Sequence, residues 1–381
     1  MIEKNAKIYV AGHHGLVGSA IWNNLLQRGY TNLIGRSHKE LDLLDPIQVK
    51  KFFDEEQPDA VVLAAAHDGG IMANLQYRAD FIYQNLQIQQ NVIGESWKHG
   101  VKKLLFLGST CIYPGEAPQP MPEDCLLTSP LEYTNEPYAI AKIAGLKMCE
   151  SFNIQYGTNY IAVMPTNLYG PNDNFHLENS HVLPAMIRKI YLAHLLENND
   201  WESVRRDIAL RPVSMKSTKM RVDGDSSEQD ILTVLASYGI APGKVTLWGT
   251  GAPMREFLWS EEMADASVHC LLNVDWKDVT EKTKFRVNRD GIEEIRNCHI
   301  NVGTGKQLSI KECAEKIVRE IGFRGQLLWD KTKPDGTMLK LTDVSKLHKL
   351  GWHHTIEIDE GIHRLFAWYK QGICINHKSA E

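Results

Sequence analysis

The chain has 381 residues, of which 43% are hydrophobic and 23% are charged, and its formal net charge at pH 7 is −5. This composition is ordinary for a folded protein and excludes a chain that is disordered throughout, while the absence of a long basic run argues against a nucleic-acid surface. The seven cysteines show no Cys-x-x-Cys spacing, and no stretch approaches the roughly 18 apolar residues of a membrane helix, so we expect a cytoplasmic protein without a metal site or a membrane partner.

The first part of the chain alternates between short apolar runs and helical patterns. The run KIYVAG ends in a glycine and precedes a segment with helical apolar spacing, which predicts a strand, a tight turn and a helix. The run DAVVLAAA is apolar throughout, as expected of a parallel strand covered on both faces. In chain order we expect strands at 7–12, 32–36, 59–66 and 102–109 and helices at 16–29, 46–57 and 79–100.

The second part continues the alternation and then loosens it. A helix at 136–157 and a strand at 160–170 are followed by less regular elements at 244–249, 260–273, 299–305 and 309–322. Strands that alternate with helices predict a doubly wound parallel sheet with right-handed crossovers, an α/β fold of the Rossmann type. The polar segments 198–243 and 275–297 are expected to be peripheral insertions.

The turn after the first expected strand reads GHHGLVG and places Gly12, Gly15 and Gly18 in a G-x-x-G-x-x-G pattern. Glycines at these points permit a tight turn and close backbone approach, and the following helix N-terminus offers free N–H groups to a pyrophosphate. Taken alone, the pattern also fits a glycine-rich turn that binds nothing.

Arg36 comes directly after the second expected strand, where a dinucleotide-binding fold meets the adenosine ribose. An acidic residue there would favour NAD, whereas an arginine accommodates the 2′-phosphate of NADP. The sequence therefore favours NADP(H) as the cofactor, the alternative being an ordinary surface arginine.

Tyr138 and Lys142 lie four residues apart in YAIAK, on one face of an expected helix. A nearby ammonium group lowers the pKa of a tyrosine from ~10, and we expect Lys142 to act on Tyr138 in this way. Ser109 ends the fourth strand, at the sheet edge where ligands bind in such folds, so the three groups together could polarise and protonate a ketone oxygen. The pair alone arises by chance in many helices, but the order of glycine turn, serine, tyrosine and lysine resembles the extended short-chain dehydrogenase/reductase superfamily.

Further segments narrow the resemblance to the GDP-L-fucose synthase family. They are AGHHGLVGSAI, ADFIYQN, LLFLGSTCIYP, TNEPYAIAKIAG, MPTNLYGPNDNF, SHVLPAMIRK, WGTGAPMREFLW, NVGTG and KPDGTMLKL. The resemblance implies NADPH-dependent conversion of GDP-4-keto-6-deoxy-D-mannose into GDP-L-fucose, by epimerisation at C3 and C5 and hydride reduction at C4. It also implies an NADP-binding Rossmann domain, placed at 1–175 with later segments returning to it, and a smaller C-terminal α/β substrate-binding domain that makes up most of 176–381. A homodimer formed through the helices near 80–99 and 136–155 is a further implication.

The resemblance assigns roles to individual residues. Cys111 and His181 match the family's base and acid for epimerisation. The implied catalytic set is Ser109, Cys111, Tyr138, Lys142 and His181. The implied cofactor-binding set is Gly12, Gly15, Leu16, Val17, Gly18, Arg36, Tyr138, Lys142 and His181. The implied contacts for the GDP of the substrate are Arg188, Trp248, Arg255 and Lys333. Each could instead be a core or surface residue.

Three residues depart from the family pattern. His14 replaces an arginine of the glycine turn, which leaves Arg36 as the main contact expected for the 2′-phosphate. His67 and Asp68 stand where many members have Lys-Val or apolar residues, which keeps open a 4-reductase or single epimerase/reductase that acts on a related GDP-4-keto sugar such as a heptose. A dehydratase or 4-epimerase is a further alternative, although the fourth strand is followed here by Ser-Thr-Cys, and a non-enzymatic Rossmann protein is another.

Overall fold

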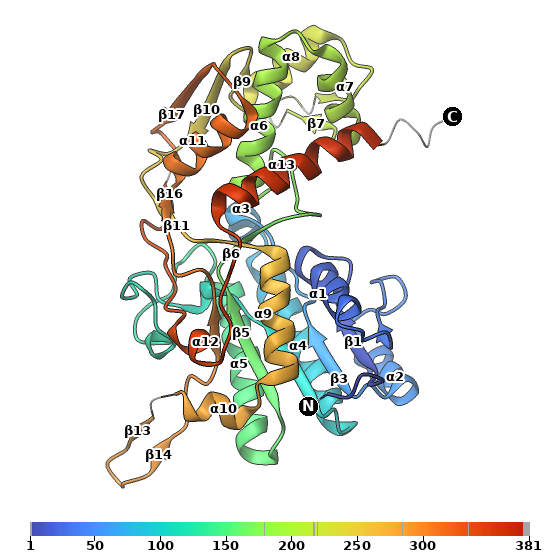
Figure 1. Ribbon diagram of the computed structural model, residues 1–381, viewed down its shortest axis with the longest axis vertical. Coiled ribbons are helices and arrows are strands. Elements are labelled where there is room, and N and C mark those ends of the chain that lie inside the picture. The colour runs from blue at the N-terminus through green and yellow to red at the C-terminus, as the bar shows by residue number, and fades with distance from the viewer. Residues whose placement is uncertain are drawn as a thin grey trace. The chain divides into compact units, whose positions relative to one another are not determined.

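The computed structural model describes residues 2–178, 180–215, 218, 220–283, 285–333 and 335–375. The chain divides into two compact units, whose elements are labelled in Figure 1. Unit 1 combines Met1–Leu168, Glu256–Lys306 and Lys340–Thr355, and unit 2 combines Tyr169–Arg255, Gln307–Leu339 and Ile356–Glu381. In the part of the chain that the structure describes, no helix has both the length and the apolar character needed to cross a membrane.

Unit 1 is built on a parallel sheet of six strands in the order β15-β5-β4-β3-β1-β2. The strands are β1 (Ile8–Ala11), β2 (Leu33–Ile34), β3 (Ala60–Leu63), β4 (Lys103–Leu107), β5 (Tyr160–Pro165) and β15 (Ile300–Val302). The strand order reverses at β1, which has β2 on one side and β3 on the other, so the ligand crevice is expected at the carboxyl ends of β1 and β3. The sheet therefore confirms the predicted doubly wound α/β fold.

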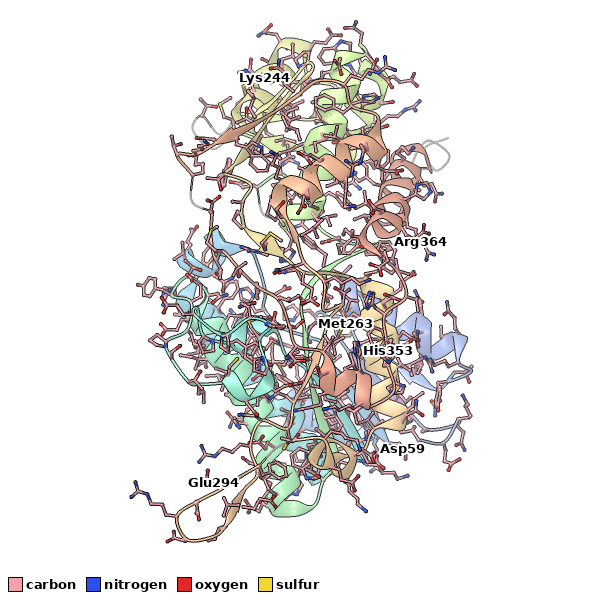
Figure 2. All side chains as sticks on the ribbon, turned by 60° about the vertical axis from the view of Figure 1, so that its left-hand side comes forward. Asp59, Lys244, Met263, Glu294, His353 and Arg364 are labelled. Carbon is pink, nitrogen blue, oxygen red and sulfur yellow. The ribbon has the colours of Figure 1, made fainter. Side chains whose placement is uncertain are left out.

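Successive residues of each strand face two different cores. Ile8 and Leu105 pack on one face with α1 (Leu16–Gln27) and α9 (Ser260–Asn273), which lie side by side in Figure 1. Met263 of α9, labelled in Figure 2, is fully buried in this layer. The other face, which includes Tyr9 and Phe106, packs against three further helices. They are α2 (Pro46–Glu56), α4 (Arg78–Lys98) and α5 (Glu136–Tyr156). Because both faces are covered, the strands are mostly apolar, with Lys103 of β4 and Asn301 of β15 as buried polar residues.

Unit 2 contains a three-stranded sheet in which β10 (Lys244–Trp248) is parallel to β17 (Gln326–Asp330) and antiparallel to β9 (Ile240–Ala241). Its helices are α6 (Val182–Glu197), α7 (Trp201–Leu210), α8 (Glu228–Ser237), α11 (Ile310–Ile321) and α13 (Ile358–Ile375). Two hairpins are β7 (Val213–Ser214) with β8 (Arg221–Val222) and β13 (Arg286–Val287) with β14 (Glu293–Glu294). In addition, β11 (Met254–Arg255) pairs antiparallel with the distant β16 (Leu308–Ser309). The remaining elements are α3 (Ile71–Gln76), η1 (Thr110–Ile112), η2 (Glu123–Cys125), β6 (Asn167–Tyr169), β12 (Phe257–Trp259), α10 (Trp276–Glu281) and α12 (Ser345–Lys349).

The structure differs from the sequence expectations in one of the two segments that were expected to be peripheral insertions. The segment 198–243 is not a loose excursion, because α7 and α8 contribute buried apolar side chains such as Val204 and Ile231 to unit 2. The segment 275–297 forms α10 and the β13–β14 hairpin. The segment Glu256–Lys306, from the C-terminal half of the chain, also belongs to unit 1, because Ile300 of β15 pairs with Val163 and extends the sheet.

Candidate functional site

The glycine turn after β1 is shaped by close backbone contacts. Gly12 has φ +84°, and a Cβ there would lie 2.8 Å from the backbone nitrogen of Ala65, so only glycine fits. A Cβ on Gly18 would lie 2.1 Å from the carbonyl oxygen of Gly12, which fixes how closely α1 approaches the turn. Helix α1 begins at Leu16 after Gly15, and within the described chain no side chain caps it. Its first N–H groups are therefore available to a pyrophosphate.

Basic and imidazole groups lie beside this turn. Arg36 follows β2, and its guanidinium bonds Glu56 at 2.6 Å and lies 5.7 Å from the Phe52 ring centroid. The rings of His13 and His14 have centroids 3.8 Å apart. Burial, the charge of His14 and that of Arg36 lower the pKa of His13 against the opposing effect of Glu40. The turn, the uncapped helix and the neighbouring arginine together fit an NADP molecule.

Ser109 and Cys111 lie just beyond the carboxyl end of β4. The chain leaves the strand in an extended conformation at Ser109 and then forms the single turn η1. The hydroxyl of Ser109 accepts a hydrogen bond from the backbone N–H of Cys111 at 3.2 Å. This contact holds the hydroxyl and the thiol on one short turn at the edge of the sheet.

Tyr138 and Lys142 reach the same edge from α5. Gly145 allows the close approach, because a Cβ there would lie 2.4 Å from the Phe106 ring of β4. The Lys142 ammonium is buried, donates a hydrogen bond to the carbonyl of Leu107 at 2.8 Å and lies 5.7 Å from the Tyr138 ring centroid. Helix α5 thus brings the tyrosine and the lysine to the strand that precedes the serine.

The pKa of Tyr138 moves opposite to the sequence expectation. Burial raises it well above the ordinary tyrosine range, and the charges of Asp68 and Cys111 add to the rise. Burial also lowers the pKa of Lys142, to about 8, although Asp68 opposes this change. The expectation that Lys142 lowers the pKa of Tyr138 is therefore wrong for the structure described, because burial dominates. A phenol that stays protonated at neutral pH is suited to donating a proton.

The thiol of Cys111 is shifted in the other direction. Burial is the largest single effect and raises its pKa, but the charge of Lys340 and the hydrogen bonds with Ser109, Lys340 and Asn135 together outweigh burial, so that the pKa lies below the ordinary cysteine value. The Lys340 ammonium is 3.5 Å from the sulfur. Sequence reasoning missed Lys340 because it follows Cys111 by 229 positions, and its segment was recognised only as part of the family resemblance.

His181 is exposed and precedes α6 at its N-cap, in unit 2. Ser109, Cys111, Tyr138 and Lys142 all belong to unit 1. The pairing of His181 with Cys111 stays a prediction.

Three of the four residues expected to hold GDP lie together in unit 2. Trp248 ends β10 and is 58% exposed, and the Lys333 ammonium lies 5.7 Å from its ring centroid. Arg255 of β11 is partly buried, with burial lowering its pKa against the opposing charge of Asp335. A Cβ on Gly336, in the same loop as Asp335, would lie 3.6 Å from the Arg255 guanidinium. An exposed indole beside Lys333, with Arg255 near the loop that follows Lys333, suits a base and a diphosphate.

Arg188 does not belong to this group. It is fully buried and bonds the equally buried carboxylate of Asp207 at 2.9 Å. Its other donors bond the carbonyl oxygens of Phe175 at 3.1 Å and Arg211 at 2.6 Å. A guanidinium satisfied inside the fold has no donor to offer a diphosphate, so the expectation for Arg188 is corrected here.

The neighbouring Lys189 has the properties that were expected of Arg188. It is buried, and burial lowers its pKa to about 8. Among the described residues no carboxylate forms an ion pair with it. A buried cation without a protein partner is typical of a ligand site, and the signal in the sequence was its place beside Arg188 in SHVLPAMIRK.

His67 and Asp68 follow β3 near Tyr138. The His67 ring packs against Phe81 with centroids 4.7 Å apart, and Phe81 lies 6.3 Å from the Tyr138 ring. Asp68 is exposed, and its charge reaches both Tyr138 and Lys142. The two residues that depart from the family pattern are therefore close enough to influence the reacting groups.

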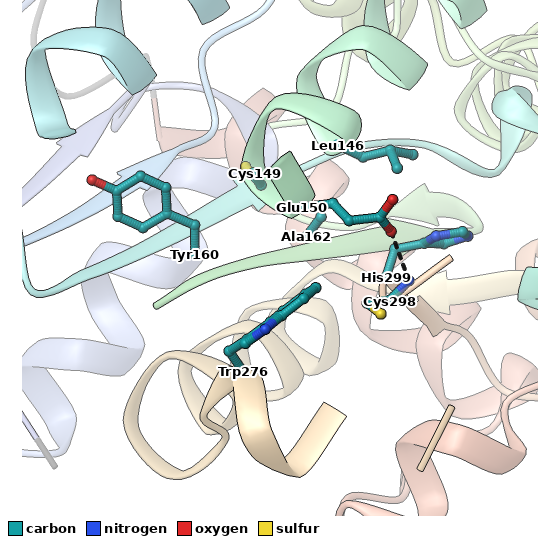
Figure 3. Close-up of a pocket in the computed structure, with 8 residues that line it drawn as sticks. All are labelled: Leu146, Cys149, Glu150, Tyr160, Ala162, Trp276, Cys298 and His299. Atoms are coloured by element: carbon teal, nitrogen blue, oxygen red, sulfur yellow. Dashed lines mark hydrogen bonds between the residues drawn. The ribbon is translucent and has the colours of Figure 1, made fainter. Parts of the chain in front are cut away.

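A separate small cavity of about 10 Å³, the room needed by a single water molecule, lies in unit 1 between α5, β5 and the chain before β15 (Figure 3). It is lined by Leu146, Cys149, Glu150, Tyr160, Ala162, Trp276, Cys298 and His299. Burial raises the pKa of Cys298 to about 12 and lowers that of His299 well below its ordinary value, so neither group carries charge at neutral pH. The Glu150 carboxylate accepts a hydrogen bond from the Cys298 N–H at 3.1 Å. This cavity is a packing feature, because it is too small for a substrate and its Glu150 carboxylate is already bonded to Lys147 and to the Cys298 backbone.

Sequence and structure comparisons define the family. The model of the NAD dependent epimerase/dehydratase family matches residues 8–209. The chain is 46% identical over 375 residues to GDP-L-fucose synthase 1 of Arabidopsis thaliana, covering 98% of this chain and 96% of that protein. It is 44% identical over 365 residues to GDP-L-fucose synthase of Escherichia coli (strain K12), covering 95% and 96%.

One solved structure is a GDP-D-glycero-L-gluco-heptose synthase from Campylobacter jejuni, determined in the presence of NADPH. It is 41% identical, with a TM-score of 0.86, and the match covers 97% of this chain and 100% of that chain. The chain belongs to the NAD dependent epimerase/dehydratase family. Within that family it is similar over nearly its whole length to GDP-L-fucose synthases.

Proposed function

We propose that this protein converts GDP-4-keto-6-deoxy-D-mannose into GDP-L-fucose with NADPH, by epimerisation at C3 and C5 and reduction at C4. The observation that carries the proposal is the cluster after β4, where a thiol of lowered pKa, Cys111, lies within electrostatic reach of a phenol of raised pKa, Tyr138. The thiol of Cys111 is suited to accepting a proton, as epimerisation requires, and the phenol of Tyr138 to donating one, as reduction requires. Similarity to GDP-L-fucose synthases supports the choice of sugar.

Cys111 and His181 are the proposed base and acid of the epimerisation. The thiolate takes a proton from a carbon beside the C4 ketone, and the electrons of that C–H bond move onto the C4 oxygen as an enolate. The hydroxyl groups of Ser109 and Tyr138 stabilise this charge. His181 donates a proton on the opposite face, which inverts the centre.

Reduction at C4 uses the same polarised carbonyl. The cofactor is NADP(H), and it supplies the hydride when bound. Tyr138 gives its proton to the C4 oxygen, and Lys142, held by the Leu107 carbonyl, bonds the nicotinamide ribose. His181 is the remaining residue proposed to contact the cofactor.

The rest of the cofactor is assigned to the glycine turn and β2. Gly12, Gly15 and Gly18, with Leu16 and Val17 of the first turn of α1, hold the pyrophosphate, and Arg36 binds the 2′-phosphate. Unit 1 is thus the proposed NADP-binding domain.

Unit 2 is the proposed substrate-binding domain. Trp248 packs against the guanine, and the cations of Arg255 and Lys333 hold the diphosphate. Lys189 is added to this set because its buried ammonium has no carboxylate partner among the described residues.

The test is incubation with GDP-4-keto-6-deoxy-D-mannose in deuterated water, with and without NADPH, followed by NMR. Deuterium at C3 and C5 and an L-fucose product are expected. The variant Cys111→Ser should lose deuterium uptake, whereas Tyr138→Phe should lose reduction and keep a slowed uptake, because Ser109 still stabilises the enolate. An absence of deuterium at both carbons, with NADPH still oxidised, would refute the epimerase half of the proposal.

A second candidate is a reductase or single epimerase/reductase for a related GDP-4-keto sugar such as a heptose. It is favoured by the 41% identity to the Campylobacter jejuni heptose synthase over 97% of the chain, and by the position of His67 and Asp68 near Tyr138. Turnover of a GDP-4-keto-heptose at a higher kcat/KM than the deoxymannose substrate would favour this candidate.

We also propose a cytoplasmic homodimer. Helices α4 and α5 expose large apolar side chains, which suits a surface that pairs with a second copy. They are Tyr83, Trp97, Ile140, Ile154 and Tyr156. The six described cysteines are free thiols, which suits a reducing compartment. Light scattering should give twice the mass of the chain, and Ile154→Glu with Tyr83→Glu should give the monomer mass.

A further inference from the structure

Cys111 and Lys340 form a contact that neither the glycine turn nor the Tyr138–Lys142 pair explains. The ammonium nitrogen lies 3.5 Å from the sulfur, and both residues belong to unit 1. Across the described residues Lys340 forms no ion pair with a carboxylate. Its charge is therefore not neutralised by another protein group and acts on the thiol.

The backbone around Lys340 is held in place by its neighbours. Leu341 donates its N–H to the side-chain oxygen of Gln119 at 2.7 Å, and its carbonyl accepts the N–H of Met121 at 2.7 Å. Thr342 donates its N–H to the buried carboxylate of Glu256 at 2.9 Å. Three bonds on the next two residues fix where the lysine side chain starts.

The other described cysteines show what burial does without such a partner. Burial raises the pKa of Cys125 to about 11 and those of Cys270 and Cys313 to about 12. Burial also raises the pKa of Cys149 and Cys298. Cys111 alone among the described cysteines has a lowered pKa, and Lys340 is the largest of the groups that lower it.

We propose that Lys340 is a positioning residue for epimerisation, whose ammonium group keeps the Cys111 side chain as a thiolate aimed at the substrate carbon. The inference rests on the proposed function, since it concerns the base of that reaction. The thiolate forms an S–H bond with the proton removed from carbon, and the C–H electron pair passes to the C4 oxygen. The proton later leaves the thiol for water, which regenerates the ion pair with Lys340. The groups that face the sulfur are Lys340, Ser109, Asn135 and Tyr138.

The first experiment measures the thiol without any substrate. The rate of Cys111 alkylation by iodoacetamide is followed against pH, with Cys111→Ser giving the background of the other cysteines. Lys340→Met and Lys340→Gln should slow alkylation at pH 7 at least about tenfold, because an opposite charge this close strongly favours the thiolate. They should also move the midpoint of the pH profile upward. Lys340→Arg keeps the charge and should restore most of the rate.

A matched control is Lys349→Met. It removes one positive charge from α12, in the same segment of unit 1 as Lys340, but among the described residues Lys349 has no contact with Cys111. It should leave alkylation unchanged. Both Lys340→Met and Lys340→Gln are tested, so that the experiment still has a neutral variant if one of the two does not fold. An alkylation profile that is the same in wild type and in either folded neutral variant would overturn the proposal.

The second experiment separates proton abstraction from hydride transfer. In Lys340→Met, deuterium uptake at C3 and C5 should fall at least about tenfold at pH 7 and recover as the pH is raised. Oxidation of GDP-L-fucose by NADP⁺, which needs no prior proton abstraction at C3 or C5, should stay within about twofold of wild type. Equal losses in both assays, without recovery at high pH, would mean a structural role and overturn the proposal. A wild-type protein that turns over neither substrate would instead refute the proposed function. The alkylation profile would still show whether Lys340 favours the thiolate of Cys111.

Discussion

Replacing Arg188 should test whether its buried guanidinium serves stability or substrate binding. The Arg188→Met variant removes the bond to Asp207 at 2.9 Å and the bonds to the carbonyls of Phe175 and Arg211. The Asp207 carboxylate is completely buried, and it would keep only its bond to the Tyr369 hydroxyl and a distant contact with Arg211 at 3.8 Å. The variant therefore leaves a buried charge with most of its compensation gone.

Breaking one side of a buried ion pair costs about 3–5 kcal/mol of unfolding free energy. A unit of about 150 residues loses roughly 2–4 °C of melting temperature for each kcal/mol, so a decrease of about 10 °C is expected. Urea unfolding and thermal melting followed by circular dichroism measure both quantities. Adding Asp207→Leu should restore part of the loss, because the double variant no longer contains an unpaired charge.

The control is Arg206→Met on α7, whose partner Glu202 is mostly exposed. A surface pair of this kind contributes about 0–1 kcal/mol. If Arg188→Met costs no more than this control and weakens the binding of the GDP-sugar, then Arg188 faces the ligand and the reasoning from its burial is wrong.

Three further predictions concern the reacting groups and the cofactor. Tyr138→Phe should slow NADPH oxidation at least about 100-fold, because it removes the proton donor. Deuterium uptake measured by NMR should slow less, because Ser109 still stabilises the enolate; equal loss of both would contradict the assignment. Lys142 has a folded pKa of about 8 against an ordinary value of 10.5. In this interval the unfolded chain binds one proton more than the folded one, so the unfolding free energy of wild type should rise with pH, by up to about 3 kcal/mol relative to Lys142→Met. A difference that stays constant with pH would contradict the shift. His14→Arg adds a charge-assisted contact of about 1.5 kcal/mol, so calorimetry should show NADPH binding about tenfold tighter with NADH binding unchanged; an unchanged ratio of the two affinities would place His14 away from the 2′-phosphate.

The sheet could be predicted from sequence because its strands are short, continuous apolar runs. The expected strand at 59–66 contains β3 at Ala60–Leu63, and the expected helix at 260–273 coincides with α9. The helix expected at 136–157 ends one residue earlier, where Gly157 adopts the left-handed conformation that closes α5. Local pattern and tertiary environment agree at these elements.

Within unit 2, α11 was expected at 309–322 because its buried residues follow helical spacing, whereas α6 was harder to predict because it lacks a clear apolar stripe. Helix α6 buries residues on most of its faces, including Leu183, Ile187 and Arg188, so its sequence does not show the alternation of a surface helix. The same burial misled the assignment of Arg188, since a charged residue in a family segment reads as a ligand contact until its partner Asp207 is seen. The local sequence does not distinguish an arginine that is buried in an ion pair from an arginine that is exposed to a ligand.

Some residues of the candidate site could be predicted from local sequence, whereas another depends on a contact between distant segments of the chain. Ser109, Cys111, Tyr138 and Lys142 could be found because each lies beside a recognisable strand end or within one helical turn of its partner. Lys340 could not, because its effect on Cys111 depends on a contact between chain segments 229 residues apart. Motifs therefore identify which groups react, whereas the structure is needed to find what sets their charge.

The two reacting groups need opposite shifts of pKa within one small site. Burial alone would raise the pKa of both the thiol and the phenol, and it does so for Tyr138. The thiol escapes this rule because Lys340 supplies a positive charge at 3.5 Å, whereas the charge of Asp68 pushes Tyr138 further in the direction that burial already favours. Two groups of opposite charge, each acting on a different reacting residue, thus separate a proton acceptor from a proton donor. The proposed function uses this separation: the thiol takes protons from carbon during epimerisation, and the phenol delivers a proton to oxygen during reduction.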